Sequence, residues 1–105
     1  MRHIALFSQT GSEIAGLIKN GFTPDHIFYD QRDKDKINSC IWQCTNTTDI
    51  IKEKVKDVDF LRKCFGDPKT CYITLHGWLN ILPKEICEEY EVYNGHPGYI
   101  IDYPE

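Results

Sequence analysis

The chain alternates between short apolar runs and segments whose apolar residues follow a helical spacing. Near-continuous apolar runs are typical of strands that are buried on both faces of a parallel sheet. They predict strands at residues 3–8, 26–29, 70–75 and 91–94. Apolar residues three or four positions apart predict helices between Ser12 and Asn20, from about residue 48 to Phe65, and from Leu82 to Tyr90.

The ends of these helices carry recognisable capping residues. Ser12 is the predicted N-cap of the first helix, and residues 46–48 (Asn-Thr-Thr) supply cap candidates for the longest one. Residues 20–21 (Asn-Gly) are typical of a helix end. Residues 39–44 fit either a short strand or one helical turn, and we favour the strand.

Strands that alternate with helices predict an α/β fold: a Rossmann-like, mostly parallel sheet with helices on both faces. The length of 105 residues predicts a single domain over residues 1–105. Ligands of such sheets bind at the carboxyl ends of the strands. We therefore expect the loops at residues 8–12, 76–82 and 94–98 to converge on one binding region.

Charge and hydropathy narrow the classes of partner. Twelve Lys and Arg against sixteen Asp and Glu give a net charge of -4, which argues against a non-specific nucleic-acid binder. No apolar run approaches the roughly twenty residues that span a bilayer. Residues 1–7 also lack the features of a signal peptide. We expect a cytoplasmic protein with no membrane or nucleic-acid partner.

The five cysteines are expected to be reduced thiols, because the sequence shows no export signal. Cys40 and Cys44 have a spacing that suits two metal ligands on one helix face. A structural zinc site needs four ligands, and no second closely spaced Cys or His pair completes one. We therefore favour apolar packing of these thiols and expect no metal site.

Asn94 and His96 are the first candidates for chemistry. The Asn94 amide suits a hydrogen bond to a developing oxyanion, and the His96 imidazole suits proton transfer to the same group. The alternative is a structural turn with a surface histidine, because Asn-Gly and Pro-Gly are common turn dipeptides.

Two further loops are candidate binding segments. Residues 9–12 precede a helix N-terminus, a position that favours anions, although Glu13 would repel a phosphate there. A plain capped helix is the alternative. In the loop at 76–83, Gly77 and Trp78 suit a flat slot for an aromatic ring, and a packed loop is the alternative.

Taken in order, these loops resemble the N-terminal half of the folate-dependent formyltransferases, both the phosphoribosylglycinamide formyltransferase-like and the phage-type members. A first strand leads to a Gly-Ser loop at residues 8–12. A later strand leads to a Gly-aromatic-x-x-Ile-Leu-Pro segment at 77–83, and an Asn-x-His-Pro motif follows at 94–97. The likeness spans essentially the whole chain.

The resemblance implies transfer of a formyl group from the cofactor 10-formyltetrahydrofolate to a small-molecule amine acceptor. Asn94 and His96 would be the catalytic residues that stabilise the tetrahedral oxyanion and manage the proton. The acceptor would lie against Thr10, Gly11 and Ser12. The folate would be bound by residues of the later loop: Gly77, Trp78, Leu79, Asn80, Ile81 and Leu82.

The sequence also departs from the family. Gln9 and Glu13 stand in a loop that is usually richer in Gly and Asn, which disfavours a phosphoribosyl acceptor. Relatives are considerably longer, and their third catalytic residue, an Asp, lies in the half that this chain does not match. Activity is therefore expected to need a complementing C-terminal half. The alternatives are a catalytically incomplete folate- or nucleotide-binding module, and a protein-interaction domain whose exposed sheet edge and apolar face are covered by a partner or by a second copy in a homodimer.

Overall fold

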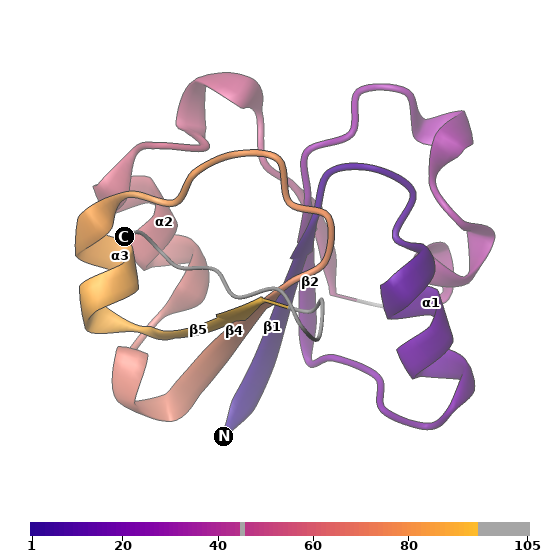
Figure 1. Ribbon diagram of the computed structural model, residues 1–105, viewed down its shortest axis with the longest axis horizontal. Helices are drawn as coiled ribbons and strands as arrows, with labels where there is room; N and C mark the ends of the chain where they lie inside the picture. The colour runs from indigo at the N-terminus through magenta and orange to yellow at the C-terminus, as the bar shows by residue number, and fades with distance from the viewer. Residues whose placement is uncertain (45, 95–105) are drawn as a thin grey trace.

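The computed structural model describes residues 1–44 and 46–94, and they form an α/β fold around a parallel sheet (Figure 1). The sheet order is β3-β2-β1-β4-β5, and every neighbouring pair of strands is parallel. The Rossmann-like fold class predicted from the sequence is confirmed. The strands are β1 (Arg2–Phe7), β2 (His26–Tyr29), β3 (Thr47–Asp49), β4 (Cys71–Leu75) and β5 (Glu91–Asn94).

Helices cover both faces of this sheet. Figure 1 shows α1 on one side of the strands and α2 with α3 on the other. The α-helices are α1 (Ser12–Lys19), α2 (Val58–Phe65) and α3 (Lys84–Glu89). Short 3-10 helices lie in the segments that connect strands and helices: η1 (Lys34–Lys36), η2 (Ser39–Gln43), η3 (Lys52–Lys54) and η4 (Pro68–Thr70).

The alternation of side chains along β1 produces two cores. Ile4 and Leu6 point to the α2 and α3 side, where they join a cluster that includes Leu61. Ala5 and Phe7 point to the opposite side and join a cluster with Ile14 of α1. The side chains of these four β1 residues are fully buried. The apolar run that predicted this strand is therefore explained by burial on both faces.

The strand order fixes where ligands are expected. From β1 the chain moves outward through β2 to β3, then crosses back so that β4 pairs with the other side of β1. The direction of winding therefore reverses between β1 and β4. In open α/β sheets, the crevice outside the carboxyl ends at such a reversal is the usual binding place.

Two predicted elements are wrong. Residues 39–43 form the 3-10 helix η2 rather than the favoured strand, because the Asn38 side chain accepts a hydrogen bond from the Cys40 N–H at 3.0 Å. Residues 47–49 form β3 rather than a helix cap, and α2 begins only at Val58. Its N-cap is Asp57, whose carboxylate accepts from the Phe60 N–H at 3.1 Å.

The cap of α1 also differs from the prediction. Gly11 is the N-cap, in a left-handed conformation with φ 74°, and Ser12 is the first helical residue. The Thr10 hydroxyl accepts a hydrogen bond from the Ser12 N–H at 3.3 Å. At the other end, Asn20 is the C-cap, as the sequence predicted. The predicted turn at 95–98 lies outside the described residues.

Candidate functional site

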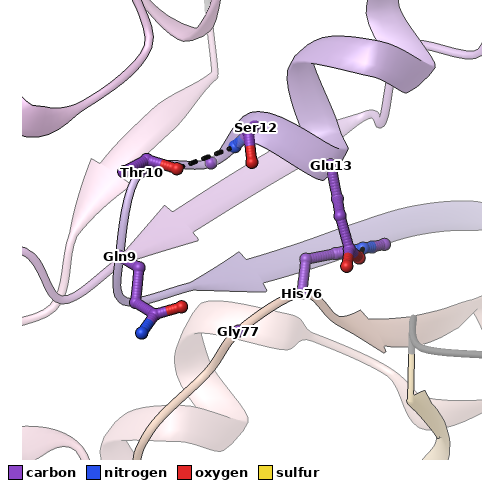
Figure 2. Close-up of a pocket in the computed structure, with 7 residues that line it drawn as sticks. Gln9, Thr10, Ser12, Glu13, His76 and Gly77 are labelled. Atoms are coloured by element: carbon purple, nitrogen blue, oxygen red, sulfur yellow. Dashed lines mark hydrogen bonds and ion pairs between the residues drawn. The ribbon is translucent and has the colours of Figure 1, made fainter.

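A small pocket lies at the carboxyl end of the sheet between β1 and β4 (Figure 2). It has a volume of about 60 Å³, enough for a few waters or one small polar group but far below a typical cofactor site. The residues that line it come from the loop after β1, the start of α1 and the end of β4: Gln9, Thr10, Gly11, Ser12, Glu13, His76 and Gly77.

The two loops that form the pocket are hydrogen-bonded to each other. The Ser8 N–H donates to the Gly77 carbonyl at 3.2 Å, and the buried Ser8 hydroxyl accepts from the Leu79 N–H at 3.0 Å. Gly77 has a φ of 71°, and a Cβ there would lie 3.0 Å from the Gln9 Oε1. This position therefore favours glycine both for its backbone conformation and for space.

His76 and Glu13 form the charged part of the pocket. The His76 Nδ1 lies 3.1 Å from the Glu13 Oε1, and Figure 2 shows the two side chains directed at each other. The His76 side chain is buried, whereas that of Glu13 is 38% exposed. A carboxylate beside an imidazole is suited to proton transfer. The Glu13 carboxylate is an acceptor that suits a hydrogen-bond-donating or positively charged group.

The residues predicted to bind an acceptor lie together in this pocket. Thr10, Gly11 and Ser12 all line it, and the hydroxyls of Thr10 and Ser12 add hydrogen-bonding groups beside Glu13. The left-handed backbone at Gly11 turns the chain from β1 into α1. The pocket therefore offers one carboxylate and several neutral polar groups to a small ligand.

The predicted folate-binding residues divide into a buried and an exposed group. Trp78 and Leu82 pack against the core under α2 and α3. Leu79 and Ile81 are 69% and 79% exposed. The Asn80 amide donates to the Asp30 Oδ2 at 2.7 Å, so this loop reaches from β4 to the end of β2. Gly77 lines the pocket itself.

The predicted catalytic pair is described only in part. Asn94 ends β5 and is paired in register with Leu75 of β4. It therefore belongs to the same edge of the sheet as the pocket, one strand beyond β4. Its predicted partner His96 lies outside the described residues.

The contact between Glu13 and His76 was not predicted from the sequence. The sequence places Glu13 at a helix N-terminus as a group that repels phosphate, and His76 in a candidate binding loop for which a packed loop is the alternative. The sequence holds a signal only for the neighbouring contact of His76 with Thr74: the two residues are two positions apart at the end of a strand, so both project to the same face. Their hydrogen bond, with 2.8 Å between His76 Nε2 and Thr74 Oγ1, is consistent with that spacing.

The cysteines are free thiols in the structure. Burial raises the pKa of Cys44, and the neighbouring Cys40 raises it further. Within residues 1–44 and 46–94, no group of three or more His, Cys, Asp or Glu side chains is arranged to hold a metal ion. Over the same residues, no helix has the length and apolar character needed to cross a membrane.

The chain has no match among protein-family models, curated proteins or solved structures. The fold class follows from the strand order and the parallel pairing. Functional inference for this protein therefore depends on its own motifs and on the geometry of its site.

Proposed function

We propose that this chain is the folate- and acceptor-binding part of a formyltransferase, which transfers a formyl group from 10-formyltetrahydrofolate to an amine. The hydrogen bond from the Leu79 N–H to the Ser8 hydroxyl is the observation that carries the proposal. It joins the Gly-Ser loop and the Gly-aromatic-x-x-Ile-Leu-Pro loop at the point of the sheet where a ligand is expected. Two of the three family motifs therefore meet there.

The acceptor amine would occupy the small pocket. Thr10 and Ser12 offer hydroxyls, and the Glu13 carboxylate favours a positively charged or hydrogen-bond-donating group. The same carboxylate, at the start of α1, opposes a phosphate at this helix N-terminus. The geometry thus supports an amine acceptor that carries no phosphate in this pocket.

The folate would lie outside the pocket, on the loop that follows β4. A volume of about 60 Å³ is too small for a pterin, but Leu79 and Ile81 present apolar side chains to solvent from the loop whose Gly77 lines the pocket. Exposed apolar groups next to backbone polar groups suit a flat heterocycle. The formyl group would then lie between this loop and the acceptor pocket.

The chemistry assigned to the site is acyl transfer. The amine attacks the formyl carbon, the carbonyl π electrons move to oxygen, and the Asn94 amide would donate a hydrogen bond to that oxyanion. Collapse of the intermediate breaks the bond to the folate nitrogen, which takes up a proton, and leaves a formamide. His96 would assist the proton transfer, as the resemblance implies.

An interaction domain is the second candidate, and one observation favours it. Leu79 and Ile81 lie exposed on the same loop, an arrangement that also suits a protein partner or a second copy of the chain. The two functions differ in a simple way. A folate site binds a small molecule to the monomer, whereas an interaction surface changes the mass of the particle in solution.

A calorimetric titration with 5-formyltetrahydrofolate, a stable analogue of the donor, tests the proposal. We expect micromolar binding that is lost in the Leu79→Ala/Ile81→Ala variant. Phe22→Ala is the matched control, because Phe22 is 68% exposed but lies before β2, at the opposite end of the sheet. No binding by the folded protein would reject a folate site. A dimer that dissociates in the Leu79→Ala/Ile81→Ala variant would favour the interaction domain.

A further inference from the structure

A line of hydrogen bonds leads from the pocket across β4 to β1. The Glu13 Oε1 lies 3.1 Å from the His76 Nδ1, and the His76 Nε2 lies 2.8 Å from the Thr74 Oγ1. The same Thr74 oxygen lies 2.6 Å from the Nε2 of His3. His3 is the second residue of β1, so the line runs from the carboxyl edge of the sheet towards its amino edge.

The parallel register of β1 and β4 produces this alignment. His3 pairs with Tyr72, and Ala5 pairs with Thr74, so the side chains of His3 and Thr74 project to the same face. The His3 ring stacks on the Tyr72 ring with 4.8 Å between centroids and an interplanar angle of 8°. This stacking fixes the plane of the imidazole that faces the Thr74 hydroxyl.

The four groups have two complementary arrangements of protons. With Glu13 ionised, His76 donates from Nδ1 to the carboxylate, Thr74 donates to the His76 Nε2, and His3 donates from Nε2 to Thr74. If one proton binds the His3 Nδ1, each of the three hydrogen-bonded protons shifts one step towards the pocket. Glu13 is then neutral, His76 and His3 have changed tautomer, and one proton has been gained.

We propose that Glu13, His76, Thr74 and His3 form a proton relay, through which the carboxyl group in the pocket exchanges a proton at His3, towards the amino edge of the sheet. The Glu13 side chain is 38% exposed, and a ligand in the pocket would cover it. The relay would then be the route by which this carboxyl gains or loses a proton. The relay goes beyond the proposed function, since it depends on no folate and no formyl transfer.

The groups around His3 suit its place at the end of the relay, where the imidazole must give up a proton readily. Burial lowers the pKa of His3, and the nearby His76 lowers it further, whereas Asp25 raises it. The Asp25 carboxylate also accepts a hydrogen bond from the His3 backbone N–H at 2.7 Å. Among the described residues, the charges of Asp25 and His76 act on His3, the titratable Tyr72 stacks on its ring, and Glu13 contacts His76.

Nuclear magnetic resonance of the histidine ring nitrogens tests the relay in the intact chain. In the wild-type protein we expect His76 to carry its proton on Nδ1 at neutral pH. We expect Glu13→Gln to lower the titration midpoint of His3, because a negative charge coupled to it is removed. Thr74→Val removes the shared hydroxyl but keeps the side-chain shape and strand preference. In that background, Glu13→Gln should move the His3 midpoint much less.

Two further variants separate the relay from simpler effects. Thr74→Ser restores a hydroxyl and should restore the effect of Glu13 on His3. Thr48→Val is the matched control, because Thr48 Oγ1 lies 3.2 Å from the His26 Nε2 in a separate Thr–His pair. Thr48→Val should leave the effect of Glu13→Gln on the His3 titration midpoint unchanged. An equal shift of the His3 midpoint in the wild-type and Thr74→Val backgrounds would show a through-space charge effect and overturn the relay. So would a His76 proton on Nε2, or no shift at all.

Discussion

The Leu79 backbone N–H donates to the hydroxyl of Ser8 at 3.0 Å, although the two residues lie 71 positions apart in the sequence. Ser8 follows β1 and Leu79 follows β4, so the bond closes the two loops over the point where the direction of winding reverses. Ser8 is only 6% exposed, which shields the bond from water. The candidate site therefore has a fixed frame rather than two independent loops.

Replacing Ser8 with Ala tests this frame. The Leu79 N–H would lose its acceptor, at a cost of about 1 kcal/mol in the free energy of unfolding. For a domain of this size the melting temperature should fall by about 4–8 °C. Ser39→Ala is the control, because Ser39 is exposed. Loss of its hydroxyl should change the free energy of unfolding very little. Equal stabilities of the two variants in denaturant unfolding would contradict the role of Ser8.

Gly77→Ala should destabilise the protein, because residue 77 has a φ of 71° and the new Cβ would meet the Gln9 Oε1 at 3.0 Å. The expected loss is about 1–2 kcal/mol. Gly16→Ala provides the opposite case, since Gly16 lies within α1 and an added methyl group would meet no heavy atom within 4 Å. That variant should gain about 0.5–1 kcal/mol. Chemical denaturation of both variants tests whether the free energy of unfolding falls in Gly77→Ala and rises in Gly16→Ala.

The stability of the protein should fall as the pH drops below about 6.5. Burial lowers the pKa of His26 from its ordinary value of 6.5, and the Arg2 charge lowers it further. The unfolded chain therefore binds a proton at a pH where the folded chain does not, and stability is lost towards acid. His26→Gln should show a smaller loss between about pH 7.5 and about pH 5. Parallel stability curves for wild type and variant would count against this origin of the acid sensitivity.

Asp57→Ala should lower the melting temperature more than Asp59→Ala. Asp57 is the N-cap of α2 and accepts a hydrogen bond from the Phe60 N–H, which is the main cause of its lowered pKa. Asp59 lies in the same first turn but is 88% exposed, with its carboxylate near Arg62. The Asp57 contribution is present near neutral pH and is lost as the carboxyl protonates in acid. A difference that persists when both carboxyls are protonated would exclude this carboxylate cap.

Much of the fold could be predicted, because buried parallel strands leave a direct pattern in the sequence. The apolar residues of β1 and β4 are such runs, and their boundaries agree with prediction to within one residue. The region between β2 and α2 did not follow its pattern. Ile51 and Val55 fit a helical spacing, but Ile51 is 48% exposed, and the chain between them forms only the short 3-10 helix η3. At residues 47–49, pairing of β3 with β2 outweighs the local preference for the start of a helix.

The candidate site was predictable where it depends on topology. Parallel strands end at a common edge, so the order of the motifs was enough to bring Gly11 and Gly77 into one pocket. The contact between Glu13 and His76 was not predictable, because topology brings the two loops together but does not determine which of their side chains meet. The contact of His3 with Thr74 depends likewise on the register of β1 against β4, which a single sequence does not reveal.

The most direct test of the proposed folate site is a map of backbone amide shifts on adding 5-formyltetrahydrofolate to the isotope-labelled protein. We expect saturable changes at Gly77, Leu79 and Ile81, with smaller changes at Thr10 and Ser12 across the Ser8 bond. Amides near Phe22, at the other end of the sheet, should stay unchanged. Changes centred on the amino edge, or none at millimolar ligand, would contradict a folate site at the carboxyl ends of β1 and β4.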